Sequence, residues 1–316
     1  MLPDIAYPFL TLLGALLLDR ALGEPRRFHP LAGFGTLASA LERRLRRDTQ
    51  AAALARFAGI AGVLLLIVPA VLLLAWLSHL PVTGPAIDVV VLYFCIAPRS
   101  LEEHARAVGV PLAAGDLAAA REAVARIVSR DTESMDEGDI ARATVESVLE
   151  NGNDAIFGAI FWFLLAGAPG ALAFRLANTL DAMWGYRTPR FLHFGWAAAR
   201  LDDLLNWVPA RLTAFSYCIA GDTANGFRCW REQARQWYSP NAGPVMAAGA
   251  GALSVMLGGR ARYAGEWKDR PTLGSGEAAR PEHIDEALAL VRRSIRFWLV
   301  MCMYGTVISW WFLRHA

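Results

Sequence analysis

Glu150-Asn151-Gly152-Asn153-Asp154 leads into an apolar run, Ile156–Ala177, and Asn178-Thr179-Leu180-Asp181 follows that run directly. The run has the length of a membrane-crossing helix, which needs about 20 mostly apolar residues. Acids and amides beside such a span are energetically costly, so they usually persist because they have a function. We therefore expect a membrane protein whose functional site lies among these polar residues.

The composition agrees with this interpretation and excludes some classes of protein. The chain has 316 residues, of which 55% are hydrophobic and 19% charged, whereas soluble domains carry about 25% charged residues. The net charge is only +2, and no basic and aromatic constellation suits a nucleic acid, so we expect none as a partner. The four cysteines show no C-x-x-C spacing, so the sequence supports neither a disulfide framework nor a zinc site.

Further apolar segments predict an all-α, polytopic integral membrane protein that forms a single domain over residues 1–316. The clearest spans are Ile156–Ala177 and Ala55–Leu80, and Ile295–Leu313 is a third candidate. We interpret Ile5–Leu22 as a retained helix whose polar end faces a head-group region. Shorter segments are either tilted or re-entrant helices or buried core helices, and they leave between about four and seven spans; these are Ala86–Pro98, Leu204–Ala220 and Val245–Leu257.

The charges between the spans predict the orientation. Arg43, Arg44, Arg46 and Arg47 form a basic cluster, which the positive-inside rule places in the cytoplasm. If Ala86–Pro98 crosses, residues 101–153 return to the cytoplasm. We expect two amphipathic helices there, with Asp116 capping the first at Leu117–Ser129, and Asp136 or Asp139 capping the next. Residues 261–281 are rich in Gly, Pro and charge and predict a loop.

Carboxylates before the apolar run predict a metal site. On a helix, Arg142, Glu146, Glu150 and Asp154 share one face because they are four residues apart. The three acids would repel one another unless a cation lay among them, and such hard oxygen ligands suit Mg²⁺. The alternative is a solvated helix face that is paired through Arg142.

Amides and arginines add to both polar groups. Asn151 and Asn153 could orient substrate amides or complete a metal shell, although Asn153 could equally cap the following helix. Arg175 is either a phosphate ligand or a side chain that extends to the membrane interface. Asp202 and Asn206 share a helix face, and a helix cap needs only one of the two adjacent acids Asp202 and Asp203.

The motifs together resemble the membrane-bound adenosylcobinamide-phosphate synthase family of cobalamin biosynthesis, also called CobD or CbiB. The matching stretches extend in order over roughly residues 12–280: Asp19-Arg20-Ala21-Leu22-Gly23-Glu24-Pro25, His29-Pro30, Arg99-Ser100-Leu101 with His104, Arg130-Asp131-Thr132, Val145-Glu146-Ser147, Glu150-Asn151, Asp154, Asn178-Thr179-Leu180-Asp181, Gly185-Tyr186-Arg187, Phe194-Gly195, Ala199-Arg200-Leu201-Asp202-Asp203, Asn206, Pro209-Ala210-Arg211, Ser239-Pro240-Asn241-Ala242-Gly243 and Leu257-Gly258-Gly259.

The resemblance implies an amide-forming ligase that uses ATP and Mg²⁺ without a phosphate-binding loop of standard sequence. It would join the corrinoid adenosylcobyric acid to (R)-1-amino-2-propanol or its O-phosphate, giving adenosylcobinamide or its phosphate. The implied roles are metal binding or amine deprotonation for Glu146, Glu150, Asp154, Asp202 and Asp203, with Mg²⁺ on the first three; phosphate binding for Arg130, Arg175, Arg187 and Arg200; substrate contacts for Asp131, Thr132 and Asp181; and corrin amide contacts or support of the acids for Asn151, Asn178 and Asn206.

The resemblance also implies a location and an alternative. We expect a multi-pass protein of the bacterial inner membrane, embedded in the lipid bilayer, with its active site on the cytoplasmic side and with the capacity to form a homo-oligomer. The alternative is a non-catalytic, AmpE-like membrane protein of signalling or regulation. That family suits the apolar run but does not need Asn178-Thr179-Leu180-Asp181 or Arg200-Leu201-Asp202-Asp203.

A site shared by the polar residues before and after Ile156–Ala177 would require a particular path of the chain. If Ile156–Ala177 crossed the membrane fully, the polar residues before it and after it would begin on opposite sides. One common site therefore predicts that this run is re-entrant or that the later chain folds back. The most apolar part of the block should not separate its two halves.

Overall fold

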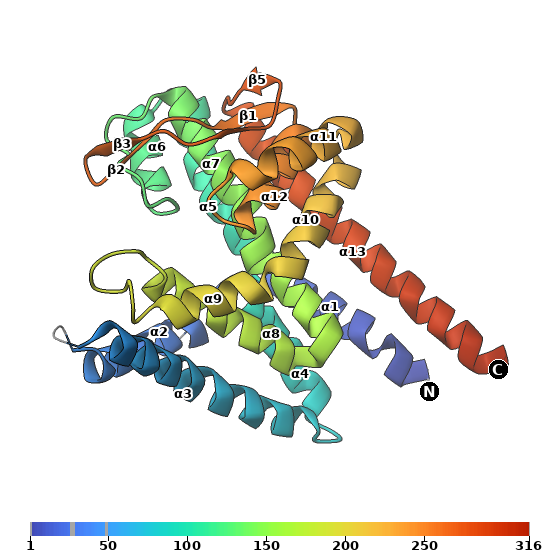
Figure 1. Ribbon diagram of the computed structural model, residues 1–316. Helices are drawn as coiled ribbons and strands as arrows, with labels where there is room; N and C mark the ends of the chain where they lie inside the picture. The colour runs from blue at the N-terminus through green and yellow to red at the C-terminus, as the bar shows by residue number, and fades with distance from the viewer. Residues whose placement is uncertain (1, 26–28, 48–49, 316) are drawn as a thin grey trace. The chain divides into compact units, whose positions relative to one another are not determined.

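The computed structural model describes residues 2–25, 29–47 and 50–315, and this part of the chain is built mainly from helices (Figure 1). Within it, four helices are long and apolar enough to cross a membrane: Ala52–Ser78, Gly84–Ala113, Glu137–Trp184 and Glu282–His315. The predicted class, a polytopic helical membrane protein, is confirmed. The helices belong to two compact units, each of which has its own internal packing.

The first unit comprises Met1–Ala97, Asp154–Asn206 and Gly305–Ala316. Its helices are α1 (Leu2–Leu22), α2 (Pro30–Leu45), α3 (Ala52–Ser78), α4 (Gly84–Cys95), most of the π-helical turn η1 (Asn153–Phe157), α8 (Gly158–Trp184), α9 (Trp196–Leu205) and the end of α13 (Glu282–His315). Three of the predicted membrane segments thus form helices close to their expected bounds, namely Ile5–Leu22, Ala55–Leu80 and Ala86–Pro98.

The core of the first unit lies where α2, α3, α8 and α9 meet. Leu66 of α3 and Leu180 of α8 are buried there, and the rings of Trp184 and Phe194 meet edge to face with centroids 5.0 Å apart. The outer face of α3 carries exposed leucines instead, among them Leu72 and Leu73. Exposed apolar side chains along a whole helix face suit contact with lipid rather than with water.

Helix α8 reverses direction inside the predicted span. Its backbone leaves helical geometry at Ala166 and Gly167, and Gly167 has φ +66° and ψ −166°, a conformation that is essentially restricted to glycine. Arg175 Nη1 contacts the carbonyl oxygen of Asp154 at 3.3 Å. In a straight helix 21 residues would separate these groups by about 32 Å, so the chain must fold back.

The two arms of this hairpin pack closely against each other. A Cβ atom on Gly158 would lie 2.2 Å from the ring of Phe174, so only glycine admits the aromatic side chain from the returning arm. Each arm has about ten residues between the break and the polar residues, or about 15 Å of helix, which is half the thickness of a bilayer core. The prediction that Ile156–Ala177 folds back is confirmed.

The second unit comprises Pro98–Asn153 and Trp207–Tyr304. Its elements are α5 (Pro98–Ala113), α6 (Leu117–Val124), α7 (Glu137–Gly152), α10 (Trp207–Ala220), α11 (Thr223–Gln233), the short 3₁₀ helix η2 (Ala234–Gln236), α12 (Ala242–Ala252), β1 (Val255–Gly258), β2 (Ala261–Tyr263), β3 (Glu266–Lys268), β4 (Thr272–Leu273), β5 (Glu277–Ala278) and most of α13.

The predicted caps within residues 101–153 are present. The Asp116 carboxylate accepts from the Ala119 amide at 3.0 Å, and Asp136, rather than Asp139, caps α7 through the Asp139 amide at 2.7 Å. The expected pair of amphipathic helices is corrected to three, α5, α6 and α7, because residues 101–113 continue a helix that begins at Pro98. Each of the three begins at a proline or an aspartate cap.

Short strands occupy the region that follows α12. Strand β1 pairs antiparallel with β4 and parallel with β5, and β2 pairs with β3 in a small hairpin. Four of these strands lie in residues 261–281, where the sequence predicts a loop, and they are too short to give an alternating pattern. Every residue of α12 is buried, so the apolar segment at Val245–Leu257 is a core helix followed by a strand.

Candidate functional site

In the first unit, the hairpin brings acids and amides from distant parts of the sequence together. Asp154 lies at its start, Asn178 and Asp181 lie on its returning arm, and Asp202 lies on α9. Asn178 Nδ2 donates to Asp202 Oδ1 at 3.2 Å. Asn206 Nδ2 donates to both carboxylate oxygens of Asp202 at 3.1 Å, which confirms the shared helix face. We call these five residues the acid–amide group.

The electrostatics of Asp202 are unusual for a carboxylate. Its pKa is raised to about 7, chiefly because burial disfavours the charged form and because the Asp154 carboxylate lies nearby. The hydrogen bonds from Asn178 and Asn206 oppose this rise, and the negative charge of Asp203 adds to it. Asp202 therefore exchanges a proton near neutral pH, which is the range where a general base is effective.

The position of these acids in α9 excludes a capping role. Asp202 and Asp203 occupy the last turn of α9, where the helix dipole disfavours negative charge. Arg200 Nη1 contacts Asp203 Oδ2 at 3.2 Å, so one of the predicted phosphate ligands pairs with a predicted catalytic acid. Asp181 faces the charges of both Asp202 and Asp203. Like charges gathered at this cost fit a proton-exchanging or cation-binding site.

Arg175 supplies positive charge beside the acid–amide group. Its guanidinium reaches back to the Asp154 carbonyl, and its Nε is buried without a hydrogen-bond partner among the described residues. Glu24 and Asp154 are the acids whose charges act on it. A buried donor without a partner is costly, and an anionic ligand would satisfy it. Arg187, in contrast, is exposed after the end of α8.

His29 also lies near Arg175, although no role was predicted for it from the residues around it. Its Nδ1 accepts from the Leu31 amide at 3.2 Å and so caps α2, while its Nε2 lies 3.8 Å from Glu24. The pKa of His29 is lowered, first by burial and also by the charge of Arg175, although Glu24 opposes this. The only sequence signal for it is the motif that joins Glu24-Pro25 to His29-Pro30.

In the second unit, Glu146 lies in a buried ion-pair network. Only 2% of the residue is exposed, and its carboxylate accepts from Arg130, from Arg270 at 2.8 and 3.2 Å, and from the Gly258 amide at 2.8 Å. Glu146 therefore does not lie on a solvated helix face. It does not pair with Arg142 either, since Arg142 donates to Asp139 instead. Arg270 comes from the segment between β3 and β4, and no local pattern marks it as a partner of Glu146.

The neighbouring predicted residues stabilise the same region. Asp131 accepts from the amides of Ala264 and Gly265 at 3.1 and 2.7 Å, which ties it to the turn between β2 and β3. Arg130 also donates to the hydroxyl of Tyr263 at 3.2 Å. Thr132 is buried one residue later. These contacts give Arg130 and Asp131 a structural task that the sequence alone did not indicate.

The remaining members of the first polar block differ in exposure. Glu150 and Asn151 are exposed at the end of α7, and Asn151 Nδ2 donates to the Ser147 carbonyl at 2.9 Å. Asn153 is buried and accepts from Thr213 at 2.9 Å, so its proposed role as a cap of the next helix is not observed. Asp154 belongs to the first unit, whereas Glu146 and Glu150 belong to the second.

The fit of a magnesium ion differs between these acids. Within the described ranges, no three His, Cys, Asp or Glu side chains gather as metal ligands. Mg²⁺ requires less than that, because it commonly binds one or two carboxylates together with water and substrate phosphates. Asp154 and its neighbours fit this requirement. The oxygens of Glu146 are occupied by guanidinium groups, and the set of Glu146, Glu150 and Asp154 as Mg²⁺ ligands stays a prediction.

Comparisons with known proteins agree over most of the chain. A family model described as "CobD/Cbib protein" matches residues 12–291. A "Cobalamin biosynthesis protein CobD" from Chromobacterium violaceum is 55% identical, covering 93% of this chain and 95% of its own. The same name describes relatives from Stutzerimonas stutzeri, 54% identical over 94% and 97%, and from Mycobacterium tuberculosis, 40% identical over 89% and 90%. No solved structure matches.

Proposed function

The chain belongs to the CobD/Cbib family and acts in cobalamin biosynthesis, and from this membership we propose that it performs an amide-forming step. The proposed reaction joins a carboxylate of adenosylcobyric acid to the amine of (R)-1-amino-2-propanol or of its O-phosphate, with ATP as the energy source. The AmpE-like alternative gains no support, because the relatives carry the cobalamin biosynthesis name.

The chemistry requires an activated carboxylate. The γ-phosphoryl group of ATP would move to a carboxylate oxygen of the corrinoid, which releases ADP and leaves an acyl phosphate. The amine nitrogen would then attack the acyl carbon, so that a C–N bond forms, the C–O bond to phosphate breaks and inorganic phosphate leaves. The amine arrives protonated at neutral pH, so a base must remove its proton before the attack.

The acid–amide group of the first unit is the observation that carries this proposal. Asp202, with a pKa of about 7, is well suited to accept the amine proton near neutral pH. Arg175, with its buried Nε, offers positive charge to a phosphoryl group or to the developing oxyanion. Asn178 and Asn206 hold the Asp202 carboxylate through Nδ2 donors and so fix its direction.

Magnesium fits beside this group. Bound Mg²⁺ would neutralise the phosphoryl oxygens of ATP, and Asp154 is the carboxylate that would hold it together with water and phosphate ligands. A cation at Asp154 would also lower the pKa of Asp202, because it would cancel a neighbouring negative charge. Proton acceptance and cation binding are therefore linked in this proposal.

The test is corrinoid amidation by the full-length protein purified in detergent. The reaction would contain adenosylcobyric acid, ATP and Mg²⁺, with aminopropanol in one arm and its O-phosphate in the other, and the product would be identified by mass. We expect ATP-dependent product in at least one arm. Absence of product in both arms, from protein with an intact thermal transition, would refute the reaction.

A matched pair of variants tests the site. Asp202→Asn should lower turnover at least about 100-fold, which is the usual contribution of a general base. Glu133→Gln removes an exposed acid outside the group and should leave turnover unchanged. In the wild type, turnover should rise with pH through about 7. This rising limb of the pH profile should move to lower pH as the Mg²⁺ concentration is increased. A limb that does not respond to Mg²⁺ would contradict the link between Asp154 and Asp202.

A further inference from the structure

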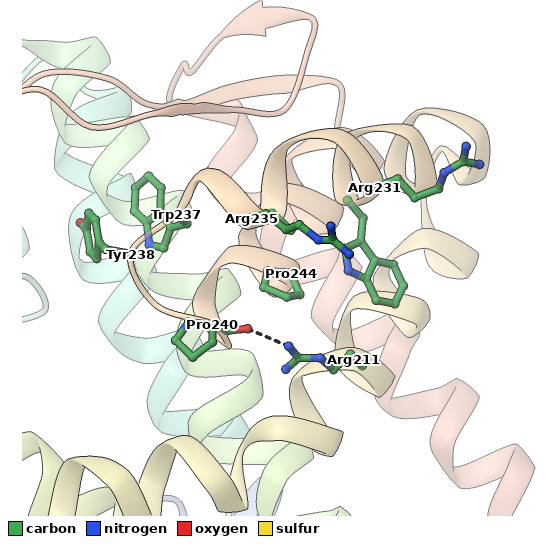
Figure 2. A pocket seen from close by; sticks show the side chains of 9 residues that line it. Arg211, Arg231, Arg235, Trp237, Tyr238, Pro240 and Pro244 are labelled. Carbon is green, nitrogen blue, oxygen red and sulfur yellow. Dashed lines mark hydrogen bonds between the residues drawn. The ribbon is translucent and has the colours of Figure 1, made fainter.

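A pocket of about 590 Å³ lies within the second unit, and no residue of the acid–amide group lines it. Its size falls within the usual 300–1,000 Å³ of small-molecule sites, and it exceeds what a single inorganic ion needs. The lining comes from α10, α11, η2, the following turn and the start of α12 (Figure 2): Arg211, Trp230, Arg231, Ala234, Arg235, Trp237, Tyr238, Pro240 and Pro244.

Three arginines give this pocket a positive charge. Arg211, Arg231 and Arg235 line it, and across the described ranges the side chains of Arg231 and Arg235 make no ion pair or hydrogen bond. In Figure 2, Arg211 and Arg235 extend toward the region around Pro244, whereas Arg231 extends away from it. Guanidinium groups without carboxylate partners select an anion, and their geometry suits phosphate oxygens.

Arg211 is held in a fixed position. Its Nη1 donates to Asn241 Oδ1 at 2.8 Å, and its Nη2 donates to the Pro240 carbonyl at 3.0 Å. These acceptors are neutral, so the charge stays available to a ligand. The pKa of Arg211 is lowered by burial, as expected for a cation without an acid to compensate it. The motifs ending at Arg211 and starting at Ser239 thus meet at this pocket.

Aromatic rings form the other part of the lining. The ring of Trp237 is stacked on that of Tyr238, with centroids 4.8 Å apart and an angle of 26° between the planes. Trp237 is buried and Tyr238 is 69% exposed, so the pair presents a supported ring to the outside. Trp230 adds a half-buried indole from α11. Such faces bind planar rings by stacking, at roughly 1–3 kcal/mol for a nucleobase.

We propose that this pocket binds a nucleotide-like ligand, a phosphorylated molecule that carries a planar ring. Arg235 and Arg211 would hold the phosphate oxygens, and the Trp237–Tyr238 pair or Trp230 would hold the ring. The pocket is not the Asp154 site at which Mg²⁺ would hold the ATP of the proposed amidation. The titrations below are therefore run without Mg²⁺, corrinoid and amine, so that the inference does not rest on that reaction.

The experiment measures binding by isothermal titration of the full-length protein in detergent. Three probes are used: ATP, inorganic tripolyphosphate and adenosine. Arg235→Gln removes one charge-assisted contact and should weaken ATP and tripolyphosphate about tenfold. Tyr238→Ala should weaken ATP about tenfold and leave tripolyphosphate unchanged. Arg228→Gln is the matched control, because Arg228 lies on α11 outside the lining and bonds to Asn225 and Ser275.

Several outcomes would overturn the proposal. An ATP affinity equal in wild type and Arg235→Gln would do so, as would a loss that Arg228→Gln shares equally, since that would report only net charge. A monomeric short-chain phosphatidylglycerol provides a fourth probe. If its binding depended on Arg235 while ATP did not bind, the pocket would be a lipid headgroup site. Intact corrinoid amidation with unchanged ATP affinity in these variants would overturn the pocket assignment and leave the proposed reaction standing.

Discussion

Replacing Glu146 by glutamine distinguishes a structural role of this acid from a catalytic one. The carboxylate accepts hydrogen bonds from two arginines and one backbone amide, and it is almost fully buried. Glu146→Gln keeps the shape but removes the negative charge, which leaves Arg130 and Arg270 without an ionic partner. Breaking a buried ion pair costs roughly 3–5 kcal/mol. For a chain of this size we expect the unfolding midpoint to fall by about 5–8 °C.

Glu150→Gln is the matched control for this experiment. Glu150 lies one helical turn after Glu146 and undergoes the same chemical change, but it is exposed. Exposed substitutions usually change stability by less than about 0.5 kcal/mol, so its midpoint should match the wild type. The assay is thermal unfolding of both purified variants in the same detergent, followed by corrinoid amidation at a temperature well below both transitions.

The two readouts together separate the roles. If Glu146 is structural, its variant should be unstable and should recover much of its turnover when assayed in the cold. A Glu146→Gln protein with the wild-type unfolding midpoint and abolished turnover would refute the structural reasoning and would support the catalytic role that the sequence predicted. Loss of turnover in Glu150→Gln without a change of midpoint would support Glu150 as a metal or catalytic acid.

Three further substitutions have expected outcomes. Folding raises the pKa of Asp202 from 3.8 to about 7, so ionisation of this carboxyl disfavours the folded state. Asp202→Asn should therefore stabilise the protein by up to about 4 kcal/mol at pH 8, and thermal unfolding scans should show that this gain shrinks toward pH 4. Gly167→Ala should lower the free energy of unfolding by about 1–3 kcal/mol, because φ is +66° at this position. Gly305→Ala in α13 is the control, since nothing lies within 4 Å of the added Cβ, and the same scans should show no measurable loss of stability. Asp136→Ala should lower stability by about 1 kcal/mol, since it removes the cap on the Asp139 amide; an unchanged midpoint would contradict this.

The helical membrane class could be predicted because its signals are local. Ala55–Leu80 and Ile295–Leu313 are apolar over the length of a bilayer, and α3 and α13 occupy these regions. Asp116 and Asp136 were identifiable as caps because their oxygens bond to amides three residues away. The strands between Ala261 and Ala278 were not predictable, since segments of two or three residues are stabilised by partners elsewhere in the chain.

In the candidate site, too, contacts between residues close in sequence could be predicted and contacts between distant residues could not. The sequence identified Asp202 and Asn206 as neighbours, because residues four apart share a helix face. It also marked Glu146 as important, but it assigned that carboxylate to a metal or to catalysis. The partner Arg270 follows Glu146 by 124 residues, and no periodicity relates two positions so far apart.

The sequence by itself determined that this chain enters a membrane, which two aspartates cap helices and which acids and amides lie beside an apolar run. It also predicted that the run at Ile156–Ala177 had to fold back if those residues were to share a site. Only the tertiary structure decided how: the chain breaks at Gly167, returns along itself and brings Asp154 to Arg175. The reason is physical, because helix formation depends on neighbours within four residues, whereas the pKa of Asp202 and the partners of Glu146 depend on side chains that only the folded chain brings near.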